Sequence, residues 1–321
     1  MNEYKLVDVK LGYSCNNNCV HCVIADKRRE LIKRKLKLDR TTEEAKKLMG
    51  VAKANGARII VLTGGEPAIR NDIFELINYA KLLGFEIQMQ TNGRMFYYKD
   101  FAEKIAKIAP IQYQFALHGS SAKIHDKITR FEGSFEQTVQ GIKNLVDLKH
   151  LDQKVIGKIV ISRKNFKYLP KIIELFADLG IENANVAFPH GMGNALLYFD
   201  EVVPTYTELK PYLISMIDTC KSFGIRVDVE SVPFCFLQGY EKHSSELYRA
   251  KDIELRDMKS AILNYTEVRK NIAKKKFPKC KKCKYYLICE GPWIEYVKGR
   301  GSSEFKPVGG RKITEKDVLG N

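Results

Sequence analysis

The strongest constraint on the fold is an alternation of short apolar runs and amphipathic segments that continues from residue 6 to residue 188. The apolar runs have the length of strands, and the segments between them have the length of helices. Strands are expected at 6–11, 58–62, 86–90, 111–117, 154–161 and 185–188, and helices at 42–55, 72–83, 100–108, 135–148 and 169–179. Six β/α units in succession favour an α/β fold with a parallel sheet or a partial barrel.

Polar or glycine-rich motifs stand directly after these expected strands. The carboxyl ends of parallel strands lie along one edge, so the loops that follow them gather at one face, where we expect the chemistry. The motifs are a cysteine loop at 15–22, Thr63-Gly64-Gly65-Glu66-Pro67, Gln90-Thr91-Asn92-Gly93, His118-Gly119-Ser120, Ser162-Arg163 and Pro189-His190-Gly191. Beyond them we expect a helix at 207–223, a short strand at 226–229 and a charged helical stretch at 240–272.

The eight cysteines form two groups and one isolated residue. Clustered cysteines in a chain without a secretory signal indicate metal binding or catalysis rather than disulfides. Cys220 lies inside the expected helix at 207–223 and is interpreted as a small buried apolar residue. The two groups are Cys15-x3-Cys19-x2-Cys22 and Cys280-x2-Cys283-x5-Cys289, the second with Cys235 upstream.

The two groups differ in how many irons of a cluster they can provide with a cysteine ligand. Three thiolates in a short loop can bind three irons of a cubane and leave the fourth iron open to a small chelating molecule, whereas four thiolates can close a cluster completely. Structural zinc is the alternative for the second group, because zinc sites also use C-x2-C spacing. Zinc fits the first group poorly, since no second C-x2-C or pair of histidines lies nearby. His21, between two cysteines of that group, is expected to point away from the metal.

The formal net charge of +16 is concentrated in two segments. Residues 27–40 contain eight basic and two acidic residues, and residues 270–284 contain eight lysines and no acid. These segments are either solvated loops or they attract an anionic partner such as a nucleotide, a nucleic acid or an acidic peptide. The sequence has neither an 18-residue apolar run nor an apolar signal-peptide core, so we expect a cytoplasmic protein that does not span a membrane.

With these motifs in view, the chain resembles the radical S-adenosylmethionine (SAM) superfamily. The matching residues are Cys15-Asn-Asn-Asn-Cys19-Val-His-Cys22 after the first expected strand and Gly64-Gly65-Glu66-Pro67 after the second, within a resemblance that covers about residues 5–195. The tail, about residues 230–310, is similar to the auxiliary-cluster domains called SPASM and twitch. The similarity is carried by Cys280-Lys-Lys-Cys283, Cys289-Glu-Gly291-Pro292, Tyr296 and Glu304-Phe305-Lys-Pro307.

The resemblance implies a partial (β/α)6 TIM-like barrel at 1–200 and a small auxiliary-cluster domain at 201–321. Cys15, Cys19 and Cys22 would hold a [4Fe–4S] cluster whose free iron binds SAM. Reductive cleavage of SAM would then give a 5′-deoxyadenosyl radical that abstracts hydrogen from the substrate. A full SPASM domain has more cysteines than this tail, so we expect one auxiliary [4Fe–4S] cluster on Cys235, Cys280, Cys283 and Cys289, with Cys235 inferred from the count alone.

The resemblance also suggests which residues bind SAM. Gly64 and Gly65 would let the backbone approach the methionine amino group, and Glu66 would offer it an oxygen. The alternatives are a plain turn for Asn92, a structural histidine for His118 and a solvated side chain for Arg163. The residues expected at SAM are Gly64, Gly65, Glu66, Asn92, His118, Ser162 and Arg163, and none is assigned as catalytic.

The substrate class is less constrained than the cofactors. Enzymes with such tails often modify peptides or proteins, which we favour, and the electron donor would be a flavodoxin or ferredoxin reductase system. The expected first strand begins near residue 6, which leaves no room for an N-terminal peptide-recognition domain and keeps a small anionic metabolite as the alternative. A non-catalytic iron–sulfur or zinc protein that binds nucleic acid is the alternative of another class.

Overall fold

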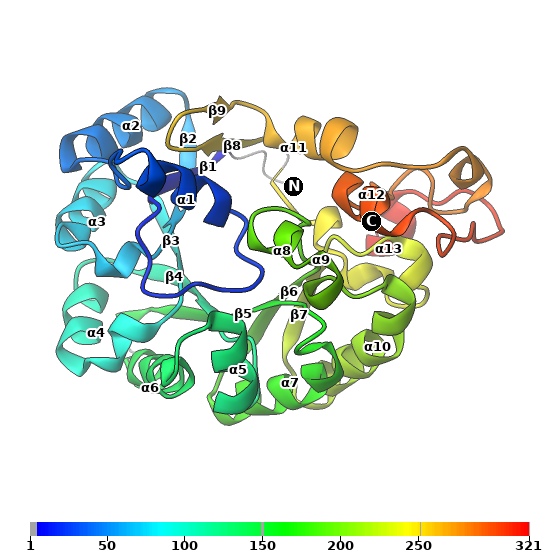
Figure 1. Ribbon diagram of the computed structural model, residues 1–321, viewed down its shortest axis with the longest axis horizontal. Helices are drawn as coiled ribbons and strands as arrows, with labels where there is room; N and C mark the ends of the chain where they lie inside the picture. The colour runs from blue at the N-terminus through cyan, green and yellow to red at the C-terminus, as the bar shows by residue number, and fades with distance from the viewer. Residues whose placement is uncertain (1–4, 149–150, 251, 321) are drawn as a thin grey trace.

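A computed structural model describes residues 5–148, 151–250 and 252–320. Its centre is a nine-stranded sheet in the order β7-β6-β5-β4-β3-β2-β1-β8-β9, in which only β8 and β9 pair antiparallel. The sheet curves into an arc with most of the long helices along its outer side (Figure 1). The strands are β1 (Lys5–Gly12), β2 (Ala57–Gly64), β3 (Glu86–Thr91), β4 (Ile111–Ala116), β5 (Lys154–Val160), β6 (Asn183–Ala187), β7 (Arg226–Glu230), β8 (Asp252–Arg256) and β9 (Ala261–Ile262).

Helices follow most strands, as the alternation in the sequence predicts. Two of them begin at capping boxes, in which Thr41 pairs with Glu44 and Thr205 with Glu208. The helices that directly precede β2 to β7 in the chain are α2 (Thr42–Ala54), α3 (Ile73–Leu82), α4 (Lys99–Ala106), α6 (Ser134–Val146), α7 (Leu169–Asp178) and α10 (Tyr206–Ser222). The others are α1 (Ala25–Lys33), α5 (Ala122–Thr129), α8 (Asn194–Leu197), α9 (Phe199–Val202), α11 (Tyr265–Val268), α12 (Ile294–Arg300) and α13 (Glu315–Leu319).

The strands alternate between two environments, and this alternation separates the core from the inner face. In β4, Tyr113 and Phe115 are fully buried and pack against Phe96, whereas Gln112 and Gln114 between them are half-buried. Successive side chains of a strand point to opposite faces, so one face of the sheet packs on the helices and the other faces the inside of the arc. The expected partial barrel is confirmed.

The sheet extends beyond residue 200, which the sequence analysis did not anticipate. The strand expected in the second region is β7, which pairs in register with β6 from Asn183↔Arg226 to Ala187↔Glu230. At the other side of the arc, β8 pairs in parallel with β1. The end of the sheet therefore does not coincide with the expected division of the chain at residue 200. Pattern alone gives the length of a short strand but not its partner.

The charged helical stretch expected at 240–272 is wrong. This segment contains short 3-10 turns, β8, β9 and the one-turn helix α11. Its charged residues are not a solvated helical face, because Glu254 is fully buried and pairs with Lys5 at 2.9 Å. The first basic segment also differs from expectation, since residues 25–33 form α1 rather than a loop. Among the described residues, none of the helices combines the length and apolarity needed to cross a bilayer.

We expect α10 and β7 to unfold together with the rest of the sheet. Met216 on α10 is fully buried, so Met216→Ala should lower the free energy of unfolding by about 2–5 kcal/mol through the lost apolar burial and the cavity left behind. Leu82→Ala is the control, because Leu82 on α3 is 83% exposed and its removal should cost within about 0.5 kcal/mol. Urea unfolding followed by circular dichroism measures both, and a second, separately shifted transition for Met216→Ala would contradict the expectation.

Candidate active site

The cysteine loop joins β1 to α1 and crosses the inside of the arc (Figure 1, dark blue). Other elements hold its backbone in place. The amides of Asn18 and Val20 donate to the carbonyl oxygens of Thr129 and Ile128 at the end of α5, at 3.0 and 2.8 Å. Asn194, the first residue of α8, binds the loop a second time: its amide donates to Cys22 O at 2.9 Å and its Nδ2 to Cys19 O at 2.8 Å.

Two arginines that the sequence analysis missed also fix this loop. Arg94 is 8% exposed and donates to the carbonyl oxygen of Asn16 and to Asn17 Oδ1, while its guanidinium stacks 3.6 Å from the ring centroid of Phe131. Arg28 on α1 donates to the carbonyl oxygen of Cys15 at 3.1 Å. The only sequence signal for Arg94 was its position directly after the Asn-Gly motif.

The three thiols lie close enough to affect one another. Burial, together with repulsion from the neighbouring Glu66 carboxylate, raises the pKa of Cys15 to about 12. Burial also raises the pKa of Cys19 well above its usual value, with added repulsion from Cys15 and Cys22. Metal binding replaces the thiol protons, so a bound metal would offset this cost of forming thiolates.

The donor set fits an iron–sulfur cluster better than a single zinc ion. Over the described ranges 5–148, 151–250 and 252–320, no three His, Cys, Asp or Glu side chains form a group that could hold one metal ion. The thiolates of a cubane bind different irons, so they need not converge on one point. His21 is buried between the cysteines and meets the ring of His118 edge-on at 4.6 Å.

The Gly64-Gly65 pair contacts the start of the cysteine loop. The amide of Gly65 donates to Gly12 O and the amide of Glu66 to Ser14 O, both at 2.8 Å. A Cβ on Gly65 would lie 2.0 Å from Ser14 O, and Gly64 has a φ of +123°, so both positions require glycine. These glycines hold the loop to the sheet. The expectation that they also approach the SAM amino group stays a prediction.

Glu66 and Asn92 meet beside the cysteine loop. The Glu66 carboxylate accepts from Ala68 N at 2.9 Å, Thr91 Oγ1 at 2.7 Å and Asn92 N at 2.6 Å. Burial raises the pKa of Glu66, although these hydrogen bonds oppose the shift. Asn92 Nδ2 donates to Asn16 Oδ1 at 2.7 Å within the cysteine loop. The structure thus brings Glu66 and Asn92 together with the first cysteine group.

His118 is a buried, neutral residue. Its Nδ1 accepts from Val160 N at 3.2 Å, and its amide donates to His125 Nδ1 at 3.0 Å. Burial lowers the pKa of His118 well below its usual value, and His21 and His125 lower it further. These bonds support a structural role for His118, whose ring contacts His21 of the cysteine loop. A role of His118 at SAM stays a prediction.

Ser162 and Arg163 bind protein groups in this structure. Ser162 is fully buried, and its amide donates to Asn165 Oδ1 at 2.7 Å in the turn after β5. Arg163 is partly exposed and pairs with Glu208 at the start of α10, at 2.7 Å. A role for either residue at SAM stays a prediction.

The inner face of the sheet is polar, unlike the packed apolar interior of a closed barrel. Lys158 on β5 pairs with Glu230 on β7 at 3.1 Å and donates to Asn185 on β6, while Arg249 binds the other oxygen of Glu230. Burial would raise the pKa of Glu230, but Arg249 and Lys158 outweigh it and hold the pKa well below its usual value. The half-buried amides of this face are Gln88, Gln90, Gln112, Gln114 and Asn185. Gln88 lies opposite Gln112 and Gln90 opposite Gln114, whereas Asn185 lies opposite Lys158.

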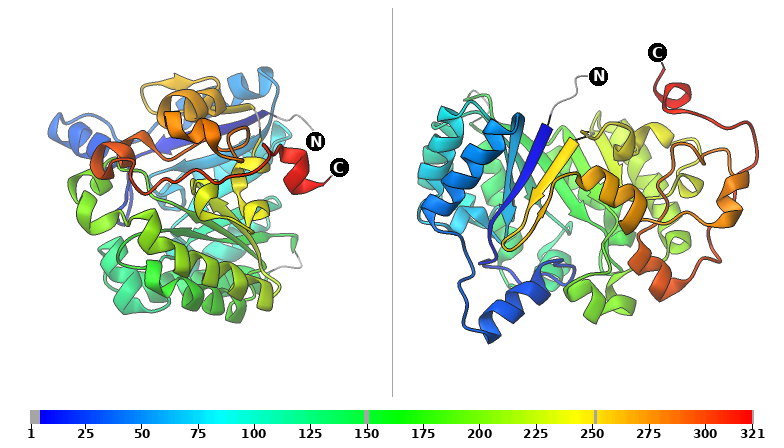
Figure 2. Two further views of the ribbon diagram at one scale, coloured as in Figure 1. Left: turned by 90° about the vertical axis from the view of Figure 1, so that its right-hand side faces the viewer. Right: turned by 90° about the horizontal axis from the view of Figure 1, so that it is seen from above.

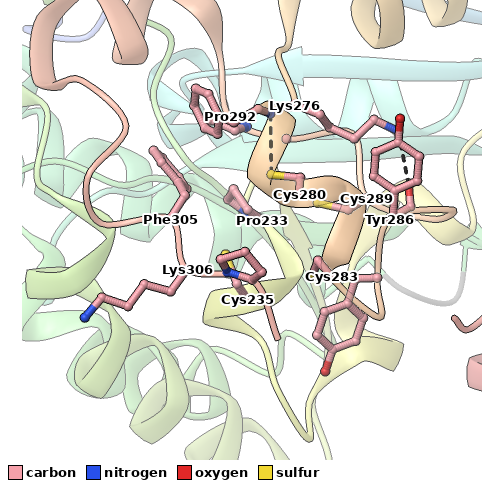
Figure 3. Close-up of a pocket in the computed structure, with 14 residues that line it drawn as sticks. Pro233, Cys235, Lys276, Cys280, Cys283, Tyr286, Cys289, Pro292, Phe305 and Lys306 are labelled. Carbon is pink, nitrogen blue, oxygen red and sulfur yellow. Dashed lines mark hydrogen bonds between the residues drawn. The ribbon is translucent and has the colours of Figure 1, made fainter. Parts of the chain in front are cut away.

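The second cysteine group lines one pocket at the other end of the molecule from α2 and α3 (Figures 1 and 3). Cys235, Cys280, Cys283 and Cys289 all lie in its wall, so the structure brings Cys235 to the three cysteines of the tail. The amide of Phe277 donates to Cys280 Sγ and the amide of Val308 to Cys283 Sγ, both at 3.4 Å. Burial and the three other thiols raise the pKa of Cys235. Four thiols with backbone donors in a mostly apolar pocket fit a fully ligated cluster.

Cys220 is apart from both groups. It lies on α10, is fully buried and packs in the main core, as its interpretation as a small apolar residue predicts.

Comparison with known proteins agrees with this site. The family description "Radical SAM superfamily" matches residues 9–176, slightly more than half of the chain. The chain belongs to the radical SAM superfamily. It is therefore an enzyme of a family that uses a [4Fe–4S] cluster and SAM, and the alternative of a non-catalytic nucleic-acid-binding protein is overturned.

Relatives of known name differ in what they act on. The AdoMet-dependent heme synthase of Methanosarcina barkeri is 31% identical over 209 residues, 63% of this chain and 55% of the relative. The probable GTP 3′,8-cyclase of Saccharolobus solfataricus is 30% identical over 196 residues, 60% of this chain and 59% of the relative. The chain thus spans slightly more than half the length of these relatives.

Solved structures share the fold over most of the chain. Streptococcus suis SuiB bound to precursor peptide SuiA covers 95% of this chain and 75% of its own, with a TM-score of 0.66 and 14% identity. At this identity the likeness concerns the fold, and it includes the region that holds the second cysteine group.

We expect Gly65→Ala to loosen the cysteine loop. The added methyl group must displace the backbone at Ser14, so the two hydrogen bonds of Gly65 and Glu66 are lost at a cost of about 1–3 kcal/mol. Iron bound per chain after anaerobic reconstitution should fall, as should the free energy of unfolding. Gly309→Ala is the matched control, because a Cβ there meets no atom within 4 Å. Unchanged iron content in Gly65→Ala would show that the loop tolerates the shift.

Proposed function

We propose that this enzyme abstracts a hydrogen atom from a residue of a peptide or protein and thereby modifies it. The observation that carries the proposal is the inner face of the sheet, which has neutral amides on β3, β4 and β6 and lies inside the arc that the cysteine loop crosses (Figure 1). Gln112 and Gln114 are half-buried and have both a donor and an acceptor, which is what pairing with peptide groups requires.

The charges of the inner face support a neutral rather than an anionic ligand. Lys158 is neutralised by Glu230, and Lys10 on β1 pairs with Asp8 at 3.3 Å. A phosphate or carboxylate group would favour a cation without a protein counter-charge. In the first basic segment, Lys27 already pairs with Asp257, and the guanidinium of Arg28 is occupied by backbone carbonyl groups of the cysteine loop.

The residues of the chain would divide the work between cofactors and substrate. When bound, the cluster and SAM supply the electron and the 5′-deoxyadenosyl radical that removes hydrogen. Cys15, Cys19 and Cys22 would hold that cluster, and Glu66 and Asn92 stand beside the loop where they can orient SAM. The amides of the inner face would hold the substrate in place, and the sheet and its helices would exclude water.

The alternative substrate, a small anionic metabolite, is supported by the names of the curated relatives, which refer to heme and to GTP. The peptide proposal has its own support in SuiB, which has the same fold and was crystallised with a precursor peptide. A cytoplasmic location and a flavodoxin or ferredoxin as electron donor stay predictions. So does the ligand role of Cys235.

A deuterium-transfer experiment distinguishes the two substrate classes. Anaerobic enzyme, SAM and dithionite are incubated with either a fully deuterated peptide digest or a fully deuterated metabolite extract, and 5′-deoxyadenosine is analysed by mass spectrometry. We expect deuterium from the peptide fraction only. Cys15→Ala should abolish 5′-deoxyadenosine, whereas Cys283→Ala should retain part of it, because the two cysteines lie in different groups. Deuterium from the metabolite fraction alone would refute the peptide proposal.

Gln114→Leu tests the inner face itself. The change keeps the side-chain size and removes both hydrogen-bonding groups, at an expected cost of about 1–3 kcal/mol in substrate binding. This corresponds to a loss of roughly 5- to 150-fold in kcat/KM for the peptide, with substrate-independent SAM cleavage unchanged. Gln140→Leu on the exposed face of α6 is the control. Equal kinetics for the two variants would mean that the inner-face amides do not contact substrate.

A further inference from the structure

The two basic segments of the chain have different surroundings. In the first, most cations are bound by the protein itself, and α1 uses them to hold the cysteine loop. The pairs are Lys27 with Asp257, Arg28 with the Cys15 and Asn17 carbonyl oxygens, Arg29 with Asn194, Arg34 with Glu30, and Lys37 with Glu44. Among the described residues, Lys27, Arg34 and Lys37 have carboxylate partners, whereas Arg28 and Arg29 keep their charge but are held in place by neutral oxygen atoms at and beside the cysteine loop.

The second segment keeps its charge on the surface. Lys270, Lys275, Lys281 and Lys282 are exposed, and none of them forms an ion pair with any residue that the structure describes. Lys274 is the exception, because it is buried and pairs with Glu246 and Glu290.

The acids near this segment are already bound. Glu290 pairs with Arg269 and Lys274, Glu304 accepts from Thr207 and Tyr296, and Glu241 accepts from Tyr285. None of these three acids forms an ion pair with Lys270, Lys275, Lys281 or Lys282, so the charge of these four lysines stays available to a partner.

Two further exposed lysines line the four-cysteine pocket, and two of the four above are next to its cysteines in the sequence. Lys276 and Lys306 are exposed and line the pocket itself, and Figure 3 shows them at either side of the sulfur atoms. Lys281 and Lys282 stand between Cys280 and Cys283 in the sequence. A partner attracted by this charge comes to rest over the cysteines. We refer to Lys270, Lys275, Lys276, Lys281, Lys282 and Lys306 as the lysine rim.

We propose that the lysine rim is the docking surface of an acidic electron-carrier protein, which exchanges one electron with a cluster held by the four cysteines. The carrier loses one electron and the cluster gains it, so no further reactant is needed. Complementary charge of this kind accelerates encounter and fixes orientation, and its effect falls with salt. The inference rests on the four cysteines holding a cluster, not on the class of substrate.

The position of the rim separates this partner from the substrate. Residues 270–284, which carry most of these lysines, lie at the edge of the molecule opposite α2 and α3 (Figure 2, orange), whereas the cysteine loop lies inside the arc. A nucleic acid would be expected to use exposed aromatic rings as stacking surfaces. The nearby Tyr286 ring is instead covered by Lys276 and Lys312, at 4.4 and 5.5 Å from its centroid.

Binding of a bacterial flavodoxin to the reconstituted full-length enzyme tests the inference without relying on turnover. Isothermal titration at low ionic strength should give a Kd that rises about tenfold in Lys281→Gln/Lys282→Gln, which is roughly 1.4 kcal/mol for two lost cations. The difference should disappear near 1 M salt, where the Debye length is about 3 Å. Lys33→Gln/Lys35→Gln is the matched control, since both lysines are exposed in the first basic segment, and it should change Kd less than twofold.

Two further readouts keep the result interpretable. Iron content and the visible spectrum must match wild type in Lys281→Gln/Lys282→Gln, and if they do not, Lys270→Gln/Lys306→Gln, outside the Cys280–Cys283 segment, replaces it. SAM cleavage driven by dithionite should be unchanged, while electron transfer from reduced flavodoxin should slow with the rise in Kd. An unchanged Kd in both lysine variants would overturn the inference. A 20-base-pair DNA duplex or a poly-glutamate peptide that binds more tightly than flavodoxin would also overturn it, if the lysine variants abolish that binding while flavodoxin binding persists.

Discussion

The contact between the ends of β1 and β2 is the constraint on which the first cysteine group depends. Gly64 and Gly65 lie so close to Gly12 and Ser14 that no side chain fits between the two backbones, and the amides of Gly65 and Glu66 bind the chain where it leaves the sheet. The cysteine loop therefore starts in a fixed direction. Arg94 and Asn194 then hold it from β3's loop and from α8, so elements far apart in sequence determine where three sulfurs lie.

Side chains that alternate between the two faces of the sheet contribute to its stability on one face and to its chemistry on the other. Tyr113 and Phe115 contribute to the core because they face the helices, and Gln112 and Gln114 remain available because they face the inside of the arc. In a closed barrel, bulky apolar side chains would fill that space. Here the sheet is open between β7 and β9, and its polar inner side leaves hydrogen-bonding groups without full burial. A partial barrel thus retains a polar face beside the reactive loop.

The sequence was sufficient for features that are local. The strands of the first half, the helix expected at 42–55 and the motifs after each strand follow from neighbouring residues, and these predictions are confirmed. Partners across long loops are not accessible from the sequence. The strand expected at 226–229 has no predicted partner, and a charged helical stretch is expected where Glu254 is buried against Lys5. The ion pair between Arg163 and Glu208 on α10 also joins residues far apart in the sequence, so it was not accessible either. Charge and periodicity identify a side chain's type but not the residue that will neutralise it.

Buried charges connect the second cysteine group to the inner face of the sheet. Lys274 and Arg269 bind Glu290, which follows Cys289, and Lys274 also binds Glu246. Removing one partner of such a network leaves a buried charge unpaired and typically lowers the free energy of unfolding by about 3–5 kcal/mol. The members of the network are therefore held in fixed positions. Ser231, which directly follows Glu230, donates its amide to Glu246 at 2.8 Å. The end of β7 therefore positions the Glu230 carboxylate, which pairs with Lys158, and the Glu246 carboxylate, which pairs with Lys274 beside the four-cysteine pocket. These contacts set the position of the pocket relative to the inner face of the sheet.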